Sequence, residues 1–291
     1  MVIGEAKAKG AISIVNAVAS GRGATLSVDL PTSAKVDVKE ERGRWKVFQN
    51  GRQVESALAS HTLRRTIMML GRDPRAYSGS VETDSLAPAG VGLKTSSSAS
   101  VAITLAVLSA FGSRYPDAGE VLGCSVSASL ASGVSITGAM DDAASCLLGG
   151  VNFVDNSSGR ILSRVSLKRS LPVLIRVPGE ESRRADVPAR YVRRFSEVAD
   201  SIFKIGIEGN TWKAMTLNGL LFSSIYSYAP SAALRAIERG ALGSGLSGTG
   251  PAVAAVFDDE RDAGRLARDW ADDGAEVIRT TTSDGGATVG T

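Results

Sequence analysis

The sequence has few of the residues on which several common kinds of site depend. Its 291 residues include two cysteines and one histidine. Cys124 and Cys146, even with His61, cannot supply the four ligands of a structural zinc site. A Ser-His-Asp hydrolase would have to use His61, and nothing around that residue in its helical pattern supports this role. We therefore expect two buried, reduced thiols in a cytoplasmic protein.

Aromatic residues are also scarce, and the positive and negative charges nearly balance. Aromatics make up 5% of the chain, and the formal net charge is only +3. The basic residues are dispersed, as in the pairs 64–65, 183–184 and 193–194. Because a nucleic-acid surface combines clustered positive charge with aromatic stacking, we expect no nucleic-acid partner.

Membrane segments are not expected either. No apolar run approaches the roughly 18–20 residues that span a bilayer. Glu5, Lys7 and Lys9 interrupt the start of the chain where a signal peptide would be apolar. We expect a cytoplasmic protein without a membrane partner.

What is present is the composition of an ordinary globular protein. Hydrophobic residues make up 43% and charged residues 22%. Strand and helix patterns are mixed without regular βαβ alternation, which predicts an α+β fold with two lobes. The polar stretch 156–170 is the candidate boundary, and we divide the chain into residues 1–158 and 159–291.

Several elements can be predicted along the chain. "AKVDVKEE" and "RWKVFQNG" (34–41 and 44–51) alternate like the two strands of one hairpin. A buried apolar helix is predicted over 98–112, and further helices over 118–131 and from Asp141 to Gly149. Residues 242–250 read as a long Gly/Ser/Thr loop before a strand, and the last Gly-rich residues as a loosely ordered tail.

The stretch "GVGLKTSSSAS" (90–100) sets a flexible, hydroxyl-rich segment directly against this apolar helix. A glycine-rich loop that enters a helix N-terminus forms an anion site, because unpaired N–H groups and the helix dipole both favour negative charge. The loop is not a Walker A motif, since Leu93 precedes Lys94 where that motif has glycine. The alternative is that Ser96, Ser97 and Ser98 only cap the helix.

The segment "ITGAMDDAASCLLGG" (136–150) presents two acids at a helix start. Asp141 or Asp142 could accept a proton from an attacking hydroxyl or hold a metal ion. The alternative is that either residue only caps the helix and complements its dipole.

The third segment, "LGSGLSGTGPAVAAVF" (242–257), contains Gly243-x-Gly245-x-x-Gly248, which formally matches a dinucleotide fingerprint. Its context contradicts that assignment, because a helix precedes the glycines and a strand follows them. The loop can still offer backbone amides to a ligand, or can be only a flexible turn.

Together the three segments resemble the GHMP kinase superfamily. "PAGVGLKTSSSAS" is similar to its phosphate loop, with Lys94 where the family has glycine, and "SGTGPAVAAVF" is similar to its third motif. Asp142 precedes Gly149 by the spacing of the family's catalytic base. Further segments, "GLKTSSSAS", "SITGAMDDAASCLLGG", "TWKAMTLNGLLFSS" and "AISIVNAVASGRGATLSVDL", look like signatures of the archaeal-type shikimate kinases.

The resemblance implies a two-lobed fold, with an N-terminal lobe like domain 2 of ribosomal protein S5 and a ferredoxin-like C-terminal lobe. It implies ATP and Mg²⁺ as cofactors and Asp142 as the base. We further expect Lys94 to act in catalysis by neutralising phosphate charge together with the loop amides. Acceptor contacts would come from Lys9, Arg22 or Lys213, from Asp142 and from the third loop. The implied nucleotide residues are Pro88, Ala89, Gly90, Val91, Gly92, Leu93, Lys94, Thr95, Ser96, Ser97 and Ser98, and those of the third loop are Gly248, Thr249 and Gly250.

One departure concerns the metal. Many GHMP kinases carry a magnesium-binding glutamate about eleven residues before the base, and "SVSASLASG" (125–133) has no acid there. The magnesium ligand could then be Ser97 or Ser98, Asp141, or only water and phosphate. Three functions follow as expectations: phosphorylation of the 3-hydroxyl of shikimate, phosphorylation of another hydroxyl such as that of homoserine, or non-catalytic nucleotide sensing.

Overall fold

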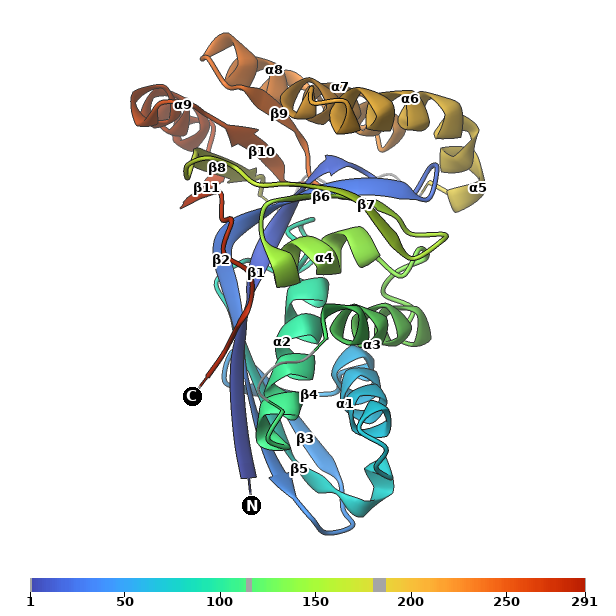
Figure 1. The fold of residues 1–291 in the computed structure, drawn as a ribbon. Helices are drawn as coiled ribbons and strands as arrows, with labels where there is room; N and C mark the ends of the chain where they lie inside the picture. The colour runs from blue at the N-terminus through green and yellow to red at the C-terminus, as the bar shows by residue number, and fades with distance from the viewer. Residues whose placement is uncertain (1, 114–116, 180–186, 291) are drawn as a thin grey trace.

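The molecule consists of two mainly antiparallel β-sheets and the helices that pack around them (Figure 1). The computed structural model describes residues 2–113, 117–179 and 187–290. The first sheet has the order β12-β1-β2-β5-β3-β4, and β6 and β7 extend it from β2. Its strands are β1 (Val2–Val15), β2 (Arg22–Lys39), β3 (Trp45–Gln49), β4 (Arg52–Val54), β5 (Ser78–Ser85), β6 (Val151–Asp155), β7 (Arg160–Val165) and β12 (Thr288–Val289).

Four helices lie on one side of the first sheet, two of them against its strands and the other two against those helices (Figure 1). They are α1 (Ala57–Met69), α2 (Thr95–Ala110), α3 (Ala118–Ala131) and α4 (Met140–Leu148). The interior of α2 is buried nearly all round, since its mostly small and apolar side chains leave no polar face to turn to water. This helix is therefore a rigid support for the loop that precedes it.

The second sheet has the order β11-β8-β10-β9, with β8 (Pro172–Val177), β9 (Gly243–Leu246), β10 (Val253–Val256) and β11 (Glu276–Thr281). Helices α7, α8 and α9 contact it, and α6 and α7 also contact β1. The remaining helices are α5 (Ala189–Val192), α6 (Ser196–Ile207), α7 (Thr211–Ile225), α8 (Ser231–Glu238) and α9 (Glu260–Asp272). None of the helices in the described ranges is both long and apolar enough to cross a membrane.

The predicted hairpin of the two early strands is wrong. β5 lies between β2 and β3, pairing antiparallel with β2 and parallel with β3. The hairpin in this region instead joins β3 to β4, and Asn50 and Gly51 form its turn with positive φ values of 48° and 73°. Asn-Gly is the sequence signal of such a turn, and it was present in "FQNG".

A second correction concerns residues 243–246, which form strand β9 and not a loop. Gly245 lies so close to α7 that a Cβ atom there would sit 2.7 Å from the Cα of Gly219. The glycines are thus required by the close approach of helix and strand. Two of the four residues of β9 are glycines, so the strand shows no alternation of polar and apolar residues and the pattern predicted a loop.

The two lobes share strands and core. β7 pairs with β6, so hydrogen bonding in the first sheet crosses the boundary set at residues 158/159. The C-terminal residues return to the first sheet, where Val289 pairs with Ala6, so the predicted loose tail is wrong for this segment. One hydrophobic cluster joins Ile12 and Ile14 of β1 to Val173 and Ile175 of β8.

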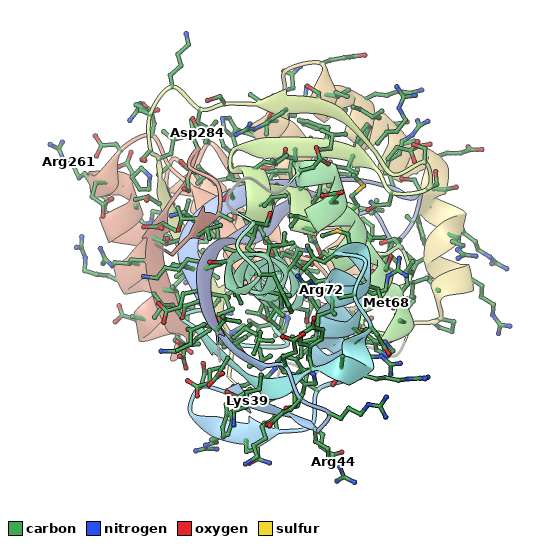
Figure 2. All side chains as sticks on the ribbon, turned by 60° about the horizontal axis from the view of Figure 1, so that its bottom comes forward. Lys39, Arg44, Met68, Arg72, Arg261 and Asp284 are labelled. Carbon is green, nitrogen blue, oxygen red and sulfur yellow. The ribbon has the colours of Figure 1, made fainter. Side chains whose placement is uncertain are left out.

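Charged side chains project outward around this core. In Figure 2, Lys39 and Arg44 lie at the lower end of the view and Arg261 at its left edge, so these basic side chains do not form one patch. Cys124 and Cys146 are buried and form no disulfide, which confirms the prediction of two buried thiols.

Candidate active site

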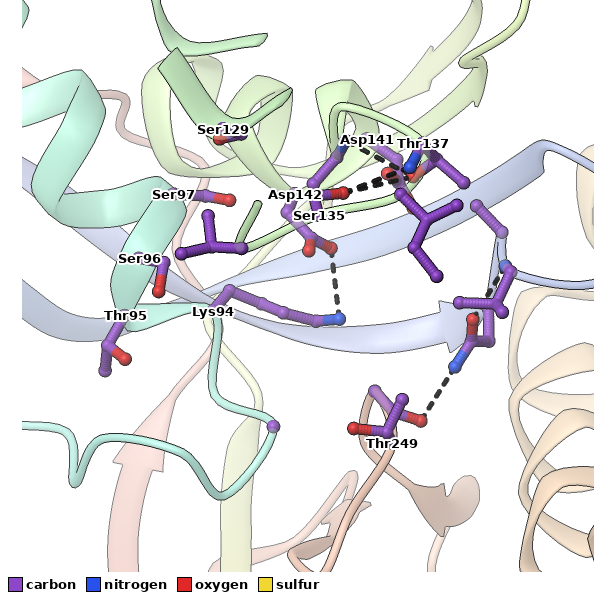
Figure 3. Close-up of a pocket in the computed structure, with 18 of the residues that line it drawn as sticks. Lys94, Thr95, Ser96, Ser97, Ser129, Ser135, Thr137, Asp141, Asp142 and Thr249 are labelled. Atoms are coloured by element: carbon purple, nitrogen blue, oxygen red, sulfur yellow. Dashed lines mark hydrogen bonds and ion pairs between the residues drawn. The ribbon is translucent and has the colours of Figure 1, made fainter. Parts of the chain in front are cut away.

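A cavity of about 340 Å³ opens where the first turn of α2, the start of α4 and the loop after β9 meet (Figure 3). These three places carry the three segments singled out in the sequence. The lining includes Gly90, Gly92, Leu93, Lys94, Thr95, Ser96, Ser97, Asp141, Asp142, Gly248 and Thr249. Segments more than 100 residues apart in the chain thus form one site.

The loop before α2 turns a row of backbone N–H groups, unpaired among the described residues, toward the start of the helix. Gly90 and Gly92 have positive φ values of 78° and 95°, which glycine adopts without steric cost. Within the described part of the chain, the backbone N–H groups from Ala89 to Ser97 have no hydrogen-bond acceptor. Unpaired N–H groups at a helix N-terminus bind negatively charged groups.

The helix begins three residues earlier than predicted. Lys94 is its N-cap residue, in the left-handed conformation and without a side-chain capping bond. Ser96, Ser97 and Ser98 therefore lie inside the first turn, and the alternative that they cap the helix is wrong. The Ser98 hydroxyl is buried and donates to the carbonyl of Ala8, 3.3 Å away, so it does not face the cavity.

Three other residues of the predicted nucleotide segment lie outside this cavity. Pro88 and Ala89 line a second hollow of about 370 Å³, together with Asn50 and Leu86. Thr95 and Ser96 line both hollows, so the two adjoin at the start of α2. Val91 packs into the core, where its carbonyl accepts a bond from the N–H of Ala252 at 3.1 Å.

Lys94 and Asp142 form an ion pair inside the cavity. The ammonium Nζ lies 3.1 Å from Oδ1 of Asp142, and the side chains are only 12% and 15% exposed (Figure 3). Asp142 lies in the first turn of α4, whose N-cap residue is Ala139 and not an acid. The structure thus brings together the two residues predicted to be catalytic.

Asp141 is buried beside them. Desolvation, reinforced by the neighbouring Asp142 carboxylate, raises the pKa of Asp141 to about 7, although Lys94 and Asn156 oppose this rise. Its carboxylate lies under β2, because a Cβ atom on Gly23 would approach Oδ2 to 2.0 Å. Asp141 therefore exchanges a proton near neutral pH within the cavity.

The third loop is held against both the phosphate loop and β1. Ser247 donates to the carbonyl of Gly92 at 2.8 Å, and Gly248 N–H donates to the Ser13 hydroxyl at 2.9 Å. Gly248 and Thr249, which the resemblance implies as acceptor contacts, line the cavity. Gly250 does not line it and packs instead against Tyr228.

The basic residues predicted to bind the acceptor lie elsewhere. Lys9 pairs with Asp29 at 2.6 Å, and Arg22 lies near Asp155 and Asp200. Lys213 is exposed on α7. None of the three lines the cavity, where Lys94 is the single basic residue among the described lining.

Residues that sequence reasoning missed also line the cavity. Asn16 follows β1, and Val134 and Ile136 lie in the loop between α3 and α4. Val134 is 52% and Ile136 64% exposed, so both offer apolar surface to a ligand in the cavity. The only signal for Asn16 was its place in the N-terminal signature, and apolar residues in a Gly/Ser loop were the signal for the other two.

Comparison with known proteins places this geometry in a family. The family model for the N-terminal domain of GHMP kinases matches residues 57–150, and the model for their C-terminal domain matches residues 213–276. The shikimate kinase of Methanothrix thermoacetophila is 35% identical over 99% of this chain and 96% of its own length. The chain belongs to the GHMP kinases. As a member, it is an ATP-dependent kinase with a small-molecule acceptor.

Other relatives agree with this assignment. The shikimate kinase of Pyrococcus furiosus is 32% identical over 96% of this chain and 99% of its own. The crystal structure of homoserine kinase from Cytophaga hutchinsonii superposes with a TM-score of 0.76 at 18% identity, covering 99% of this chain and 98% of the other. This likeness confirms the two-lobed α+β fold of GHMP kinases.

Proposed function

We propose that this kinase transfers the γ-phosphoryl group of ATP to the 3-hydroxyl of shikimate. The observation that carries the proposal is the row of unpaired N–H groups from Ala89 to Ser97 beside the Lys94–Asp142 pair, in one cavity. The shikimate kinases related to the chain over nearly its full length support the choice of acceptor.

Phosphoryl transfer depends mainly on positioning and on neutralising charge. The unpaired amides and the dipole of α2 would hold the phosphates, and the Lys94 ammonium would stabilise the charge on the transferred group. Asp142 would orient the acceptor hydroxyl and accept its proton as the new P–O bond forms. The Lys94–Asp142 contact keeps both side chains aimed at the same point before substrates bind.

The adjoining hollow can accept the rest of the nucleotide. It lies on the other side of Thr95 and Ser96, and Leu86, Ala87, Pro88 and Ala89 give it an apolar wall. Leu86 is 71% exposed there, so the adenine base of ATP would remove apolar surface of this side chain from water. ATP would then cross the loop, with its base and its γ-phosphate in different hollows.

Magnesium fits the donor groups that are present. Mg²⁺ is usually held by one or two carboxylates together with substrate phosphates, so it needs no cluster of three acids. Among the described residues no such cluster occurs. Asp141 would hold the ion, with Ser97 a second oxygen donor at the cavity, and Ser98 is turned away. When bound, the ion neutralises phosphate charge.

The cavity wall favours a ring-shaped acceptor over an acyclic amino acid. Val134 and Ile136 present exposed apolar surface that suits the carbon face of a ring. Homoserine carries an amine that calls for a free carboxylate, yet Asp142 is engaged with Lys94 and Asp141 would hold the magnesium ion. The backbone N–H of Thr249 makes no hydrogen bond within the described chain. It lies at the cavity and is available to bind the carboxylate of the substrate that receives the phosphoryl group.

The experiment is a panel of acceptors assayed for ADP formation with purified protein, ATP and Mg²⁺. The panel contains shikimate, homoserine and mevalonate, with a reaction lacking any acceptor as the control. We expect ADP formation to require shikimate and the product to carry phosphate on the 3-hydroxyl. Faster turnover of homoserine would overturn the choice of acceptor, and binding of ATP without turnover of any acceptor would indicate a nucleotide sensor.

A further inference from the structure

Asn218 is a buried amide in the middle of α7, within the signature "TWKAMTLNGLLFSS" that the mechanism leaves without a role. It is 1% exposed, and its Oδ1 accepts the backbone N–H of Asn16 at 2.8 Å. Its Nδ2 has no hydrogen-bond partner in the described structure. Burial of the unpaired Nδ2 group lowers the stability of the fold. An asparagine at this position is therefore explained by the bond of its Oδ1 to Asn16 and not by packing.

Asn16 carries this connection to the active-site loop. It is 5% exposed, and its Oδ1 accepts the N–H of Val18 at 2.9 Å. Its Nδ2 donates to the carbonyl of Gly248 at 2.7 Å, the dashed bond beside Thr249 in Figure 3. Since the N–H of Val18 can only donate, the orientation of the Asn16 amide is fixed, with Nδ2 toward the loop.

The connection ends where the reacting groups meet. A Cβ atom on Gly248 would lie 3.2 Å from Nζ of Lys94, so the loop backbone borders the Lys94–Asp142 pair. Thr249, the next residue, lines the cavity on the acceptor side. A displacement of Gly248 would therefore shift the acceptor side of the cavity relative to the base.

We infer that Asn218 is a positioning residue that sets, through Asn16, the place of Gly248 and Thr249 in the cavity. The inference rests on the proposed function for its kinetic consequences, but the bonding chain exists whichever acceptor binds. Asn218 touches neither cavity, so its effect passes through the backbone of Asn16. The nucleotide amides of residues 89–97 are not part of this chain of bonds.

The test compares Asn218→Leu with Asn218→Asp. Leucine removes the oxygen that accepts from Asn16, whereas aspartate keeps it and replaces the unpartnered Nδ2 with the second oxygen of a carboxyl group, whose burial favours the protonated form. With the acceptor identified by the panel, we expect Asn218→Leu to lower kcat/KM for the acceptor by about 10- to 100-fold, the scale of a misplacement near 1 Å. ATP affinity should stay within about threefold of wild type, and Asn218→Asp should restore most of the acceptor kcat/KM.

Thr216→Val is the matched control on the same helix. Its hydroxyl accepts the N–H of Ser244 at 3.3 Å, a bond to the second sheet that does not involve Asn16. We expect this variant to lose thermal stability comparably while its acceptor kcat/KM stays near wild type. Equal kinetic losses in Thr216→Val and Asn218→Leu would reduce Asn218 to a structural residue and overturn the inference.

Hydrogen exchange separates this inference from the proposed function. In Asn218→Leu, the hydrogen-bonded amides among residues 246–250 should exchange at least about tenfold faster than in wild type, and those inside helix α2 should not change. This result would support the positioning role even if no acceptor of the panel were phosphorylated. Unchanged exchange of residues 246–250 in Asn218→Leu would contradict the role, whatever the acceptor.

Discussion

At the scale of single residues, Lys94 shows how the site combines strain and charge. Its φ of 61° places it in the left-handed region, which costs a residue with a side chain about 1 kcal/mol. The conformation turns the chain into α2 and directs the ammonium to Asp142, 3.1 Å away. A glycine there would relieve the strain but could not supply the charge.

Asp141 predicts a pH-dependent stability. Its carboxyl ionises near pH 3.8 when unperturbed and near 7 in the fold, so its stabilising contribution is complete below pH 4 and is lost as pH rises through 7. Asp141→Asn removes this titration. The free energy of unfolding of the variant minus that of wild type should be larger at pH 8 than at pH 5 by about 1–3 kcal/mol. Thermal denaturation without Mg²⁺ measures both values. The same difference at both pH values would contradict the raised pKa.

At the scale of elements, the glycine-rich segments differ in what could be predicted. The glycines of the phosphate loop precede an apolar helix, and this contrast predicted both the loop and the helix. The glycines of β9 serve close packing against α7, which no local pattern reveals. The start of α2 was placed three residues late because serine is a common N-cap, whereas here a left-handed lysine takes that position.

A substitution of Gly92 tests the contact between the loop before α2 and the loop after β9. A Cβ atom on Gly92 would lie 2.1 Å from the carbonyl oxygen of Ser247, so Gly92→Ala must separate the phosphate loop from the third loop. We expect at least about tenfold weaker ATP binding by calorimetry. Gly71→Ala is the control, since Gly71 has a positive φ of 71° and open space around its Cβ position. It should bind ATP like wild type, and equal losses in both variants would show that strain alone is responsible.

At the scale of the whole molecule, the site exists because long strands tie the lobes together. β1 runs from the first sheet to the loop after β9, and α7 contacts both β1 and β9. Mixed strands and helices without regular βαβ alternation predicted two lobes, and the three motifs predicted which segments meet at one cavity. The rest of the cavity lining could not be predicted, because Asn16, Val134 and Ile136 meet the cavity only through tertiary packing. The dispersed cations offered for that role proved to be surface ion pairs or exposed side chains.

The most direct test of the account is the turnover of Asp142→Asn beside its affinity for ATP. The substitution keeps the shape of the side chain and removes the group that accepts the proton. We expect kcat with the acceptor to fall by about 10²- to 10⁴-fold while ATP binding is not weakened, since the unpaired amides of residues 89–97 remain. Near-normal turnover would remove Asp142 from the mechanism, and loss of ATP binding together with turnover would show that this pair holds the nucleotide and does not act on the acceptor.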